Sequence, residues 1–338
     1  MPSYAYPSAQ VLSTIEQGLL PDLVADDPIF DILPIDTQDA SLLKWQQMDD
    51  YIGLQQLRGL NGTPPRVARV GINEFQMKPG TYGEFEAIDE AEMTERAKFG
   101  SLTDVIDIGD LVAQAQEQLL HRRMTRIKYI GWTLLTAGTF SVASLNGQTL
   151  HTDSYTMQTF TASVAWSTAA TSTPLSDFRA VQLLSLGYSV DFGAKATAYM
   201  NRVTWNNFIK NTNSADLYGR RTAGLGTYEN VGDVNKLLAG DDLPQIVIYD
   251  KAYKNASGTI TRYIPNNVVV VVGVRPGGRS IGNYTMTRNV NNSDGGPGPY
   301  TKVVDNGDRA VPREIQVHDG HNGGPRLYYP SAVVVMSV

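Results

Sequence analysis

The chain has 338 residues, of which 42% are hydrophobic and 18% charged, and it contains no cysteine. At this length the composition predicts a globular protein with a large core and two domains. The lack of cysteine excludes disulfides and zinc–thiolate sites, so stability must come from packing or from partner subunits. No apolar run approaches the roughly 18 residues that cross a bilayer. The N-terminal residues lack the basic and apolar regions of a signal peptide, so none is expected.

The net charge of −6 is spread unevenly along the chain. Residues 1–110 hold 19 acidic and 7 basic side chains, whereas the remainder holds 15 acidic and 21 basic ones. This polarity suits head-to-tail contact between copies, because the acidic part of one copy would attract the basic part of the next. A solvated acidic face is the simpler explanation of the same pattern. Neither part is basic enough for a dedicated nucleic-acid reader.

Residues 1–64 do not have the pattern of a compact domain, because prolines interrupt them repeatedly. Short helices are predicted near Ser8–Leu20 and Asp39–Leu57. Between these helices the chain carries bulky apolar side chains, Phe30 and Ile32 among them, with no period that would bury them. Apolar side chains on an irregular arm usually contact a partner or the rest of the chain.

The next segment predicts a two-stranded hairpin. Its strands are Arg66–Met77 and Tyr82–Ile88, and they flank Lys78-Pro79-Gly80, a turn signal. An isolated hairpin is marginal in water, so this one is expected to lean on another surface. Its acidic side chains, including Glu84 and Glu86, are expected to be solvated or to meet basic residues of a neighbour.

A long amphipathic helix at residues 108–135 is the strongest prediction. Apolar residues recur at close to helical spacing from Ile108 to Ile130 and form one face. Acidic residues precede its first turn and basic residues fill its second half, which complements the helix dipole. Gly138 is the predicted stop.

The following segments alternate between strands and helices. Thr139–Trp166 predicts strands with a hairpin turn at Leu145-Asn-Gly, and Thr173-Pro174 predicts a helix through Leu186 that stops at Gly187. A further helix is predicted within residues 193–213. The glycine-rich stretch Arg220–Gly226 predicts a loop. It is not expected to bind phosphate, because the Lys and Ser/Thr of a phosphate-binding motif are missing from their positions. From Gln245 onward the pattern indicates strands and loops.

The last residues form a β-branched run, Val333-Val-Val-Met336. A free terminus is usually polar and frayed. This run therefore predicts a strand buried inside a sheet that upstream strands must complete.

Candidate chemistry is sparse. His318-Asp-Gly-His321 resembles a metal site, but Asp319-Gly320 predicts a turn and no third protein ligand is near. His121 and His151 stand alone, so a Ser/His/Asp triad has no support. We predict no catalytic residue, no cofactor and no metal site.

Four stretches, taken in their order, carry a resemblance. They are Asp27-Pro-Ile-Phe-Asp-Ile-Leu-Pro, His121-Arg-Arg-Met with Leu134-Leu-Thr-Ala-Gly, Ala198-Tyr-Met-Asn-Arg-Val-Thr-Trp, and Gly324-Pro-Arg-Leu-Tyr-Tyr-Pro-Ser-Ala-Val-Val-Val. Together with the strand–turn–strand that begins at Ile246, their order resembles that of the major capsid proteins of tailed bacteriophages with the Hong Kong 97-like fold. Among these, the chain looks most like the lambda-type capsid protein E family.

The resemblance implies an α+β fold with four parts. Residues 1–64 would form an N-terminal arm and residues 65–105 an extended β-hairpin loop. A peripheral domain would comprise residues 106–174 and 306–338, with the helix at 108–135 as its spine. Residues 175–305 would form an axial domain.

The resemblance also implies a shell function. Copies would assemble in the cytoplasm of the bacterial host into the hexamers and pentamers of an icosahedral head, enclosing double-stranded DNA that they contact non-specifically. Partners would be other copies, a separate scaffolding protein, a portal and a decoration protein, with no membrane. The acidic arm and loop would meet basic residues of the spine helix on the next copy. Candidate contacts between subunits are Phe30, Ile32, Lys78, Glu84, Glu86, Arg122, Arg123 and Arg126.

Three alternatives stay open at this point. An encapsulin-like nanocompartment would keep the fold and enclose protein cargo. A metal-dependent enzyme would use His318 and His321. A phage tail protein or a carbohydrate-binding β-protein fits the long helix poorly.

Overall fold

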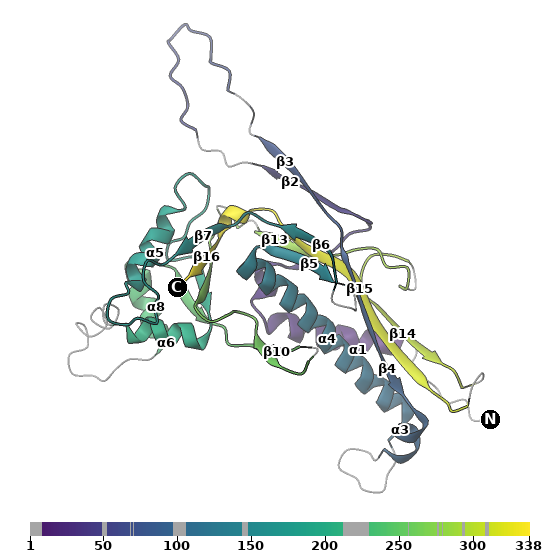
Figure 1. The fold of residues 1–338 in the computed structure, drawn as a ribbon. Coiled ribbons are helices and arrows are strands. Elements are labelled where there is room, and N and C mark those ends of the chain that lie inside the picture. The colour runs from purple at the N-terminus through teal and green to yellow at the C-terminus, as the bar shows by residue number, and fades with distance from the viewer. Residues whose placement is uncertain are drawn as a thin grey trace. The chain divides into compact units, whose positions relative to one another are not determined.

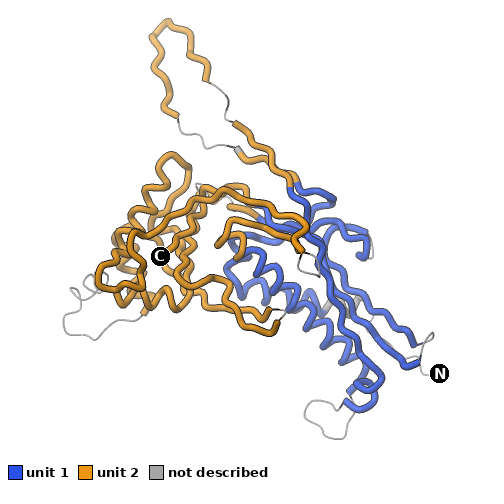
Figure 2. The backbone as a smooth tube through the Cα atoms, in the orientation of Figure 1, with its two compact units in different colours: residues 1–43, 77–131, 283–326 blue, residues 44–76, 132–282, 327–338 orange. Residues whose placement is uncertain are grey.

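The chain folds into two compact units, each assembled from three separate segments (Figure 2). Unit 1 comprises residues 1–43, 77–131 and 283–326, and unit 2 comprises residues 44–76, 132–282 and 327–338. The structure is a computed structural model. It describes residues 9–48, 53–67, 69, 71–96, 106–143, 148–211, 230–255, 257–275, 277–278, 280–292, 295–307 and 311–338. No helix in these ranges is long and apolar enough to span a membrane.

A five-stranded sheet forms one layer of unit 1 (Figure 1). Its strands are β1 (Ile35–Thr37), β4 (Gly80–Ile88), β13 (Gly282–Met286), β14 (Tyr300–Asp305) and β15 (Ile315–Leu327). The order is β1-β13-β15-β14, and β4 also pairs with the long β15. β1 runs parallel to β13, whereas β4 and β14 run antiparallel to β15.

The same unit contains helices. They are α1 (Ala9–Ala25), α2 (Ile29–Ile32), α3 (Glu90–Glu95) and α4 (Ile108–Ala137). The predicted long helix is confirmed as α4. It ends where predicted, because Gly138 adopts a φ of +67° and its N–H donates to the Leu134 carbonyl oxygen at 2.8 Å. This left-handed conformation favours glycine and terminates a helix.

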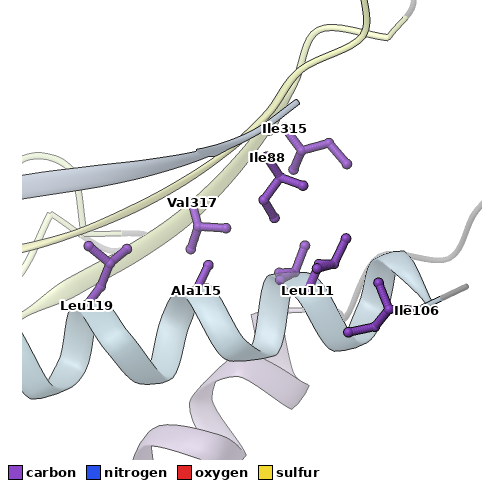
Figure 3. Packing of buried hydrophobic residues seen from close by; sticks show 8 residues of the cluster. Ile88, Ile106, Leu111, Ala115, Leu119, Ile315 and Val317 are labelled. Atoms are coloured by element: carbon purple, nitrogen blue, oxygen red, sulfur yellow. The ribbon is translucent and has the colours of Figure 1, made fainter. Parts of the chain in front are cut away.

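The core between α4 and the sheet is continuous and apolar (Figure 3). Residues of one α4 face pack beneath apolar residues of β4 and β15. The buried members are Ile88, Ile106, Leu111, Val112, Ala115, Leu119, Ile315 and Val317. Fully burying a Leu or Ile side chain contributes roughly 1.5–3 kcal/mol, so this face fixes α4 to the sheet.

The predicted hairpin at residues 66–88 is wrong in its pairing. Both strands exist, as β3 (Ile72–Met77) and β4, but β3 pairs with β2 (Leu43–Met48) and β4 pairs with β15. The register sets Ile88 opposite Ile315, so the apolar end of β4 completes the unit 1 core. A tight turn signal locates a chain reversal, and the burial of apolar residues selects the pairing.

The predicted helix at residues 39–57 is also wrong, because β2 occupies its middle. Leu43 and Trp45 are buried while Lys44 and Gln46 are exposed. This period of two is that of a half-buried strand. By contrast, the helix predicted near residues 8–20 is confirmed as α1.

Unit 2 is built around a sheet with the order β7-β16-β12-β8-β9. The strands are β7 (Gln158–Thr161), β8 (Thr197–Met200), β9 (Gln245–Ile248), β12 (Val268–Val272) and β16 (Val333–Ser337). The C-terminal strand β16 therefore lies inside the sheet, as predicted. It runs antiparallel to β12 and parallel to β7, and a short 3-10 helix (Pro330–Ala332) precedes it.

The helices of unit 2 are α5 (Pro174–Leu183), α6 (Arg202–Lys210) and α8 (Val231–Gly240). α5 begins at the predicted proline and ends three residues before the predicted end. The helix predicted within residues 193–213 covers α6, but strand β8 precedes it. Asn201 separates the two because its Oδ1 accepts the Thr204 backbone N–H at 2.8 Å, which caps α6.

Two short hairpins also belong to unit 2. β5 (Thr139–Ala143) pairs antiparallel with β6 (Thr149–Ser154), and β10 (Ala252–Lys254) pairs antiparallel with β11 (Ile260–Arg262). The predicted turn at Leu145-Asn-Gly and the predicted loop Arg220–Gly226 lie outside the described residues. The strands predicted after Gln245 are confirmed.

Candidate functional site

The most unusual surface belongs to the two-stranded sheet of β2 and β3 and the chain that joins these strands. Residues 53–67 form no helix or strand, and every one of them is exposed. Within this range Leu54, Leu57 and Leu60 are 97%, 99% and 96% exposed. Figure 1 draws residues 53–67 without helix or strand. Three leucines this exposed within seven residues make the stretch a candidate interaction surface. We call residues 53–67 the leucine segment.

Aromatic packing holds the base of this element within unit 2. The Trp45 ring stacks on Phe75, with centroids 5.9 Å apart, and lies 6.2 Å from the Tyr155 ring. The Trp45 indole N–H donates to the Leu327 carbonyl oxygen at 3.2 Å. Gln46 bridges the two strands by donating to Glu74 at 3.0 Å. The strands are therefore fixed, although the leucine segment beyond them is uncovered.

A buried charge cluster joins three elements of unit 1. Arg123 of α4 donates from Nη1 to Asp319 of β15 at 2.7 Å, and from Nη2 to Glu16 of α1. Thr301 of β14 also donates to Asp319, at 3.1 Å. Arg123 and Asp319 are each only 5% exposed. Burial raises the pKa of Asp319 to about 6, although the Arg123 charge opposes this shift.

The neighbouring arginines of α4 are exposed. Arg122 pairs with Glu84 of β4, and this hydrogen bond lowers the pKa of the Glu84 carboxyl. The Arg126 guanidinium lies 5.6 Å from the centre of the Tyr82 ring and 5.8 Å from that of Tyr129. Both distances are in the range of cation–π attraction. Partners of all three arginines thus come from the same chain.

The two histidines of the metal hypothesis lie within strand β15, where a turn was predicted. Residues three apart on a strand point to opposite faces. His318 stacks on Phe85 at 5.1 Å, whereas His321 is buried and its Nε2 is 2.9 Å from the Tyr284 hydroxyl. They do not converge, and no group of three potential ligands exists within the described residues. Burial, followed by the Arg123 and Arg126 charges, lowers the pKa of His321 to about 3.

The apolar arm residues pack against their own chain. Phe30 and Ile32 belong to α2 and are buried. Ile29 fits against Gly131 of α4, where a Cβ atom would lie 2.7 Å from the Ile29 side chain. Lys128 of α4 adds ion pairs with Asp26 at 3.4 Å and Asp27 at 3.8 Å. The arm is therefore anchored in unit 1.

The predicted contact residues thus separate into three groups, one of which is the exposed Arg122–Glu84 pair within the chain. Phe30, Ile32 and Arg123 are buried in unit 1, and their contacts complete its fold. Lys78 is exposed just after β3, and Glu86 is half-buried on β4, so these two stay candidates together with Arg126. Sequence reasoning missed the leucine segment. The available signal was Leu54-Gln-Gln-Leu57-Arg-Gly-Leu60, whose spacing of three is also compatible with a helix.

Comparison with known proteins identifies the fold. The chain is 11% identical to a protein from an Escherichia coli CFT073 prophage that is described as a capsid protein, with a TM-score of 0.58 over 95% of this chain and 98% of that one. It is also 11% identical to a phage-related protein of Bordetella bronchiseptica RB50, with a TM-score of 0.57 over 98% of each chain. These matches confirm the predicted mixed α+β capsid fold. No curated protein matches the chain.

The family model described as phage major capsid protein E matches residues 20–291, well over half of the chain. This match confirms the family that the resemblance indicated, and it favours a phage shell over both a nanocompartment and a metal-dependent enzyme. The chain therefore belongs to the phage major capsid protein E family, and it is a structural component of the icosahedral phage head and not an enzyme.

Proposed function

We propose that copies of this chain assemble into the hexamers and pentamers of the head through the β2–β3 element, with double-stranded DNA enclosed. The exposure of Leu54, Leu57 and Leu60 is the observation that carries this proposal. Burying a leucine side chain stabilises a complex by roughly 1.5–3 kcal/mol, and a soluble monomer gains nothing by exposing three together. In a shell each copy would cover the leucines of another.

Under this proposal the extended loop comprises residues 43–77, in place of the residues 65–105 that the resemblance implied. Support comes from the pairing of β2 with β3 and from the continuous exposure of residues 53–67. Obligate interfaces commonly bury more than roughly 2,000 Å², and a long exposed loop is one way for a chain of this size to reach such an area.

We also propose new bounds for the two domains. Unit 1, with residues 108–131 of α4 as the spine, would supply the peripheral domain, and unit 2 would supply the axial domain. The closing strand β16 moves to the axial domain because it pairs with β12 and β7. The scaffolding protein, the portal and a decoration protein stay predictions from the resemblance.

Microscopy of the expressed full chain tests the proposal. Negative-stain images should show closed shells, and a triple variant with serine at Leu54, Leu57 and Leu60 should give unassembled protein. Serine at Ile260, which is 77% exposed on β11, is the matched control and should leave shells intact. A wild-type chain that stays a monodisperse monomer would contradict the proposal. Shells built by the triple variant would remove the leucine segment from it.

A further inference from the structure

The first helix, α1, lies on the surface of unit 1 with shallow packing. Its side chains are described from residue 15 onward, and none of residues 15–25 is fully buried. The apolar side chains are all half-buried: Ile15, Leu19, Leu20, Leu23 and Val24. By contrast, three of the four residues of α2 are buried. α1 is therefore attached to the core and is not part of it.

An apolar hollow of about 420 Å³ lies beside α1. Leu20 and Val24 of α1 line it together with residues of three other elements, Phe30 of α2, Met124 of α4 and Met286 of β13. Well-packed interiors contain few voids larger than a water molecule. The contact of α1 with its unit is therefore incomplete, and the helix can move without disrupting a close-packed core.

Ion pairs hold α1 at two places. Arg123 of α4 donates to Glu16 in the first part of the helix. Lys128 of α4 pairs with Asp26 and Asp27, just after the helix ends. Each end of α1 thus has its own attachment to α4.

Pro21 lies inside α1, between these two attachments. Proline has no N–H to donate to the carbonyl oxygen four residues earlier, so it bends or weakens a helix at that point. Residues 9–20 can therefore move while the end of α1 stays anchored.

Arg123 serves two carboxylates, those of Glu16 and Asp319. Arg123 and Asp319 are each only 5% exposed, so little water screens their charges. The other charged and titratable groups of the elements packed here are Arg122 and Arg126 of α4, Tyr82 and Glu84 of β4, Tyr284 of β13, Tyr300 of β14 and His321 of β15.

None of these other groups neutralises the second carboxylate. Arg122 pairs with Glu84, and Arg126 is exposed. His321 is neutral above its pKa of about 3. With both carboxylates ionised, the enclosed cluster has one negative charge in excess, and a proton on Asp319 removes it.

We infer that residues 9–20 of α1 form a strap whose attachment to α4 and β15 is controlled by the proton on Asp319. When Asp319 is protonated, the charge of Arg123 is available to Glu16 alone, and the strap stays closed. When Asp319 is ionised, the two carboxylates compete for one guanidinium and repel each other, so the strap opens about Pro21. Opening separates the carboxylates and uncovers the hollow. The device lies within a single chain, so it goes beyond the proposed function and does not depend on how copies assemble.

Linkage gives the sign and the size of the effect. With the strap closed, burial raises the pKa of Asp319 to about 6, and the charge of Glu16 adds to this rise although Arg123 opposes it. Opening removes Glu16 and admits water, so the pKa returns toward its ordinary value of 3.8. The closed strap therefore binds the proton more tightly, and acid favours it. Between pH 7.5 and pH 5 these pKa values increase the ratio of closed to open strap about tenfold.

Hydrogen exchange of the full-length chain tests the inference. After correction for the pH dependence of intrinsic exchange, the peptide covering residues 9–20 should be about tenfold more protected at pH 5 than at pH 7.5. Asp319→Asn imitates the protonated side chain and should keep this peptide protected at both pH values. Asp31→Asn is the matched control, because Asp31 is exposed on α2, and it should leave the tenfold change intact.

A thiol beside the hollow gives a second readout that leaves the charge cluster unchanged. The chain has no cysteine, and Met124 is 1% exposed, so Met124→Cys supplies a single buried reporter. Its labelling rate, divided by that of the exposed thiol of Ile260→Cys in the same buffer, should be about tenfold higher at pH 7.5 than at pH 5.

Protection and labelling that do not change with pH would overturn the inference, and so would a full pH response in Asp319→Asn. Both measurements are made on unassembled subunits and repeated on shells. A response confined to shells would show that neighbouring copies control α1, and it would also overturn the inference. None of these outcomes bears on shell formation itself, so the proposed function is tested separately.

Discussion

Replacing Arg123 with methionine should destabilise the chain far more than the same change at Arg122. Arg123 and Asp319 are each 5% exposed, so Arg123→Met leaves a buried carboxylate without its cation. Breaking a buried pair in this way costs about 3–5 kcal/mol. Arg122 and Glu84 have side chains that are 67% and 48% exposed, so Arg122→Met should cost less than about 1 kcal/mol.

The cost of Arg123→Met should depend on pH. The pKa of Asp319 in the folded chain, about 6, lies above the ordinary aspartate pKa of 3.8. Folding therefore takes up a proton between these pH values, and the contribution of Asp319 to the free energy of unfolding increases as the pH falls from about 6 to 4. Loss of Arg123 raises that pKa further and also relieves the lowering of the His321 pKa. Both changes make the variant's deficit smaller in acid.

Urea unfolding of the full-length chain, followed by circular dichroism at pH 7.5 and 5.5, measures these differences. We expect a large loss for Arg123→Met at pH 7.5 that shrinks at pH 5.5, and a small loss for Arg122→Met at both. Equal losses for the two variants, or a loss for Arg123→Met that does not change with pH, would refute the reasoning.

Three further predictions concern the unit 1 core. Leu119→Ala removes a buried side chain between α4 and the sheet and should lower the free energy of unfolding by about 2–5 kcal/mol, measured from the urea midpoint; a loss below about 1 kcal/mol would contradict the packing. Gly320→Ala should cost about 1–3 kcal/mol, because its Cβ would lie 2.5 Å from the Tyr82 carbonyl oxygen, whereas Gly240→Ala meets no atom within 4 Å and should cost far less. His321 should titrate near pH 3 by NMR, so its loss of stability on acidification begins below the ordinary histidine pKa of 6.5; a midpoint near 6.5 would show that it is solvated.

Local patterns predicted the elements that depend on short-range order. The apolar period of residues 108–135 and the stop at Gly138 define α4 to within two residues. The β-branched ending predicted β16 as an interior strand, because valine side chains are usually buried and neighbouring strands of a sheet can cover them. Thr173-Pro174 located the start of α5.

Strand pairing was not predictable from local signals. Lys78-Pro79-Gly80 correctly marks a break between β3 and β4, but β4 finds its partner more than 200 residues later in β15. The same break therefore lies between two different sheets. Pairing is decided by which faces become buried together, as in the opposition of Ile88 and Ile315.

The roles of the charged and apolar candidates depended on the same long-range contacts. Arg123 meets Glu16 and Asp319, which are 107 and 196 residues away in sequence. The sequence around Phe30 and Ile32 has no helical or strand periodicity that predicts burial, yet both side chains are buried within unit 1. An arginine or an apolar residue is exposed or buried according to such neighbours, and its own type does not reveal them.

The kind of protein could be recognised from the amino-acid sequence alone. The capsid fold was indicated by a resemblance, carried by several sequence stretches and by the order of the arm, long helix and closing strand. Periodicity and turn chemistry, which are encoded in adjacent residues, by themselves predicted only helices, strands and turns. Which surfaces are free for assembly depends instead on the folded chain. Burial is a property of residues distant in sequence, and it enclosed Arg123, Phe30 and Ile32 while leaving Leu54, Leu57 and Leu60 in solvent.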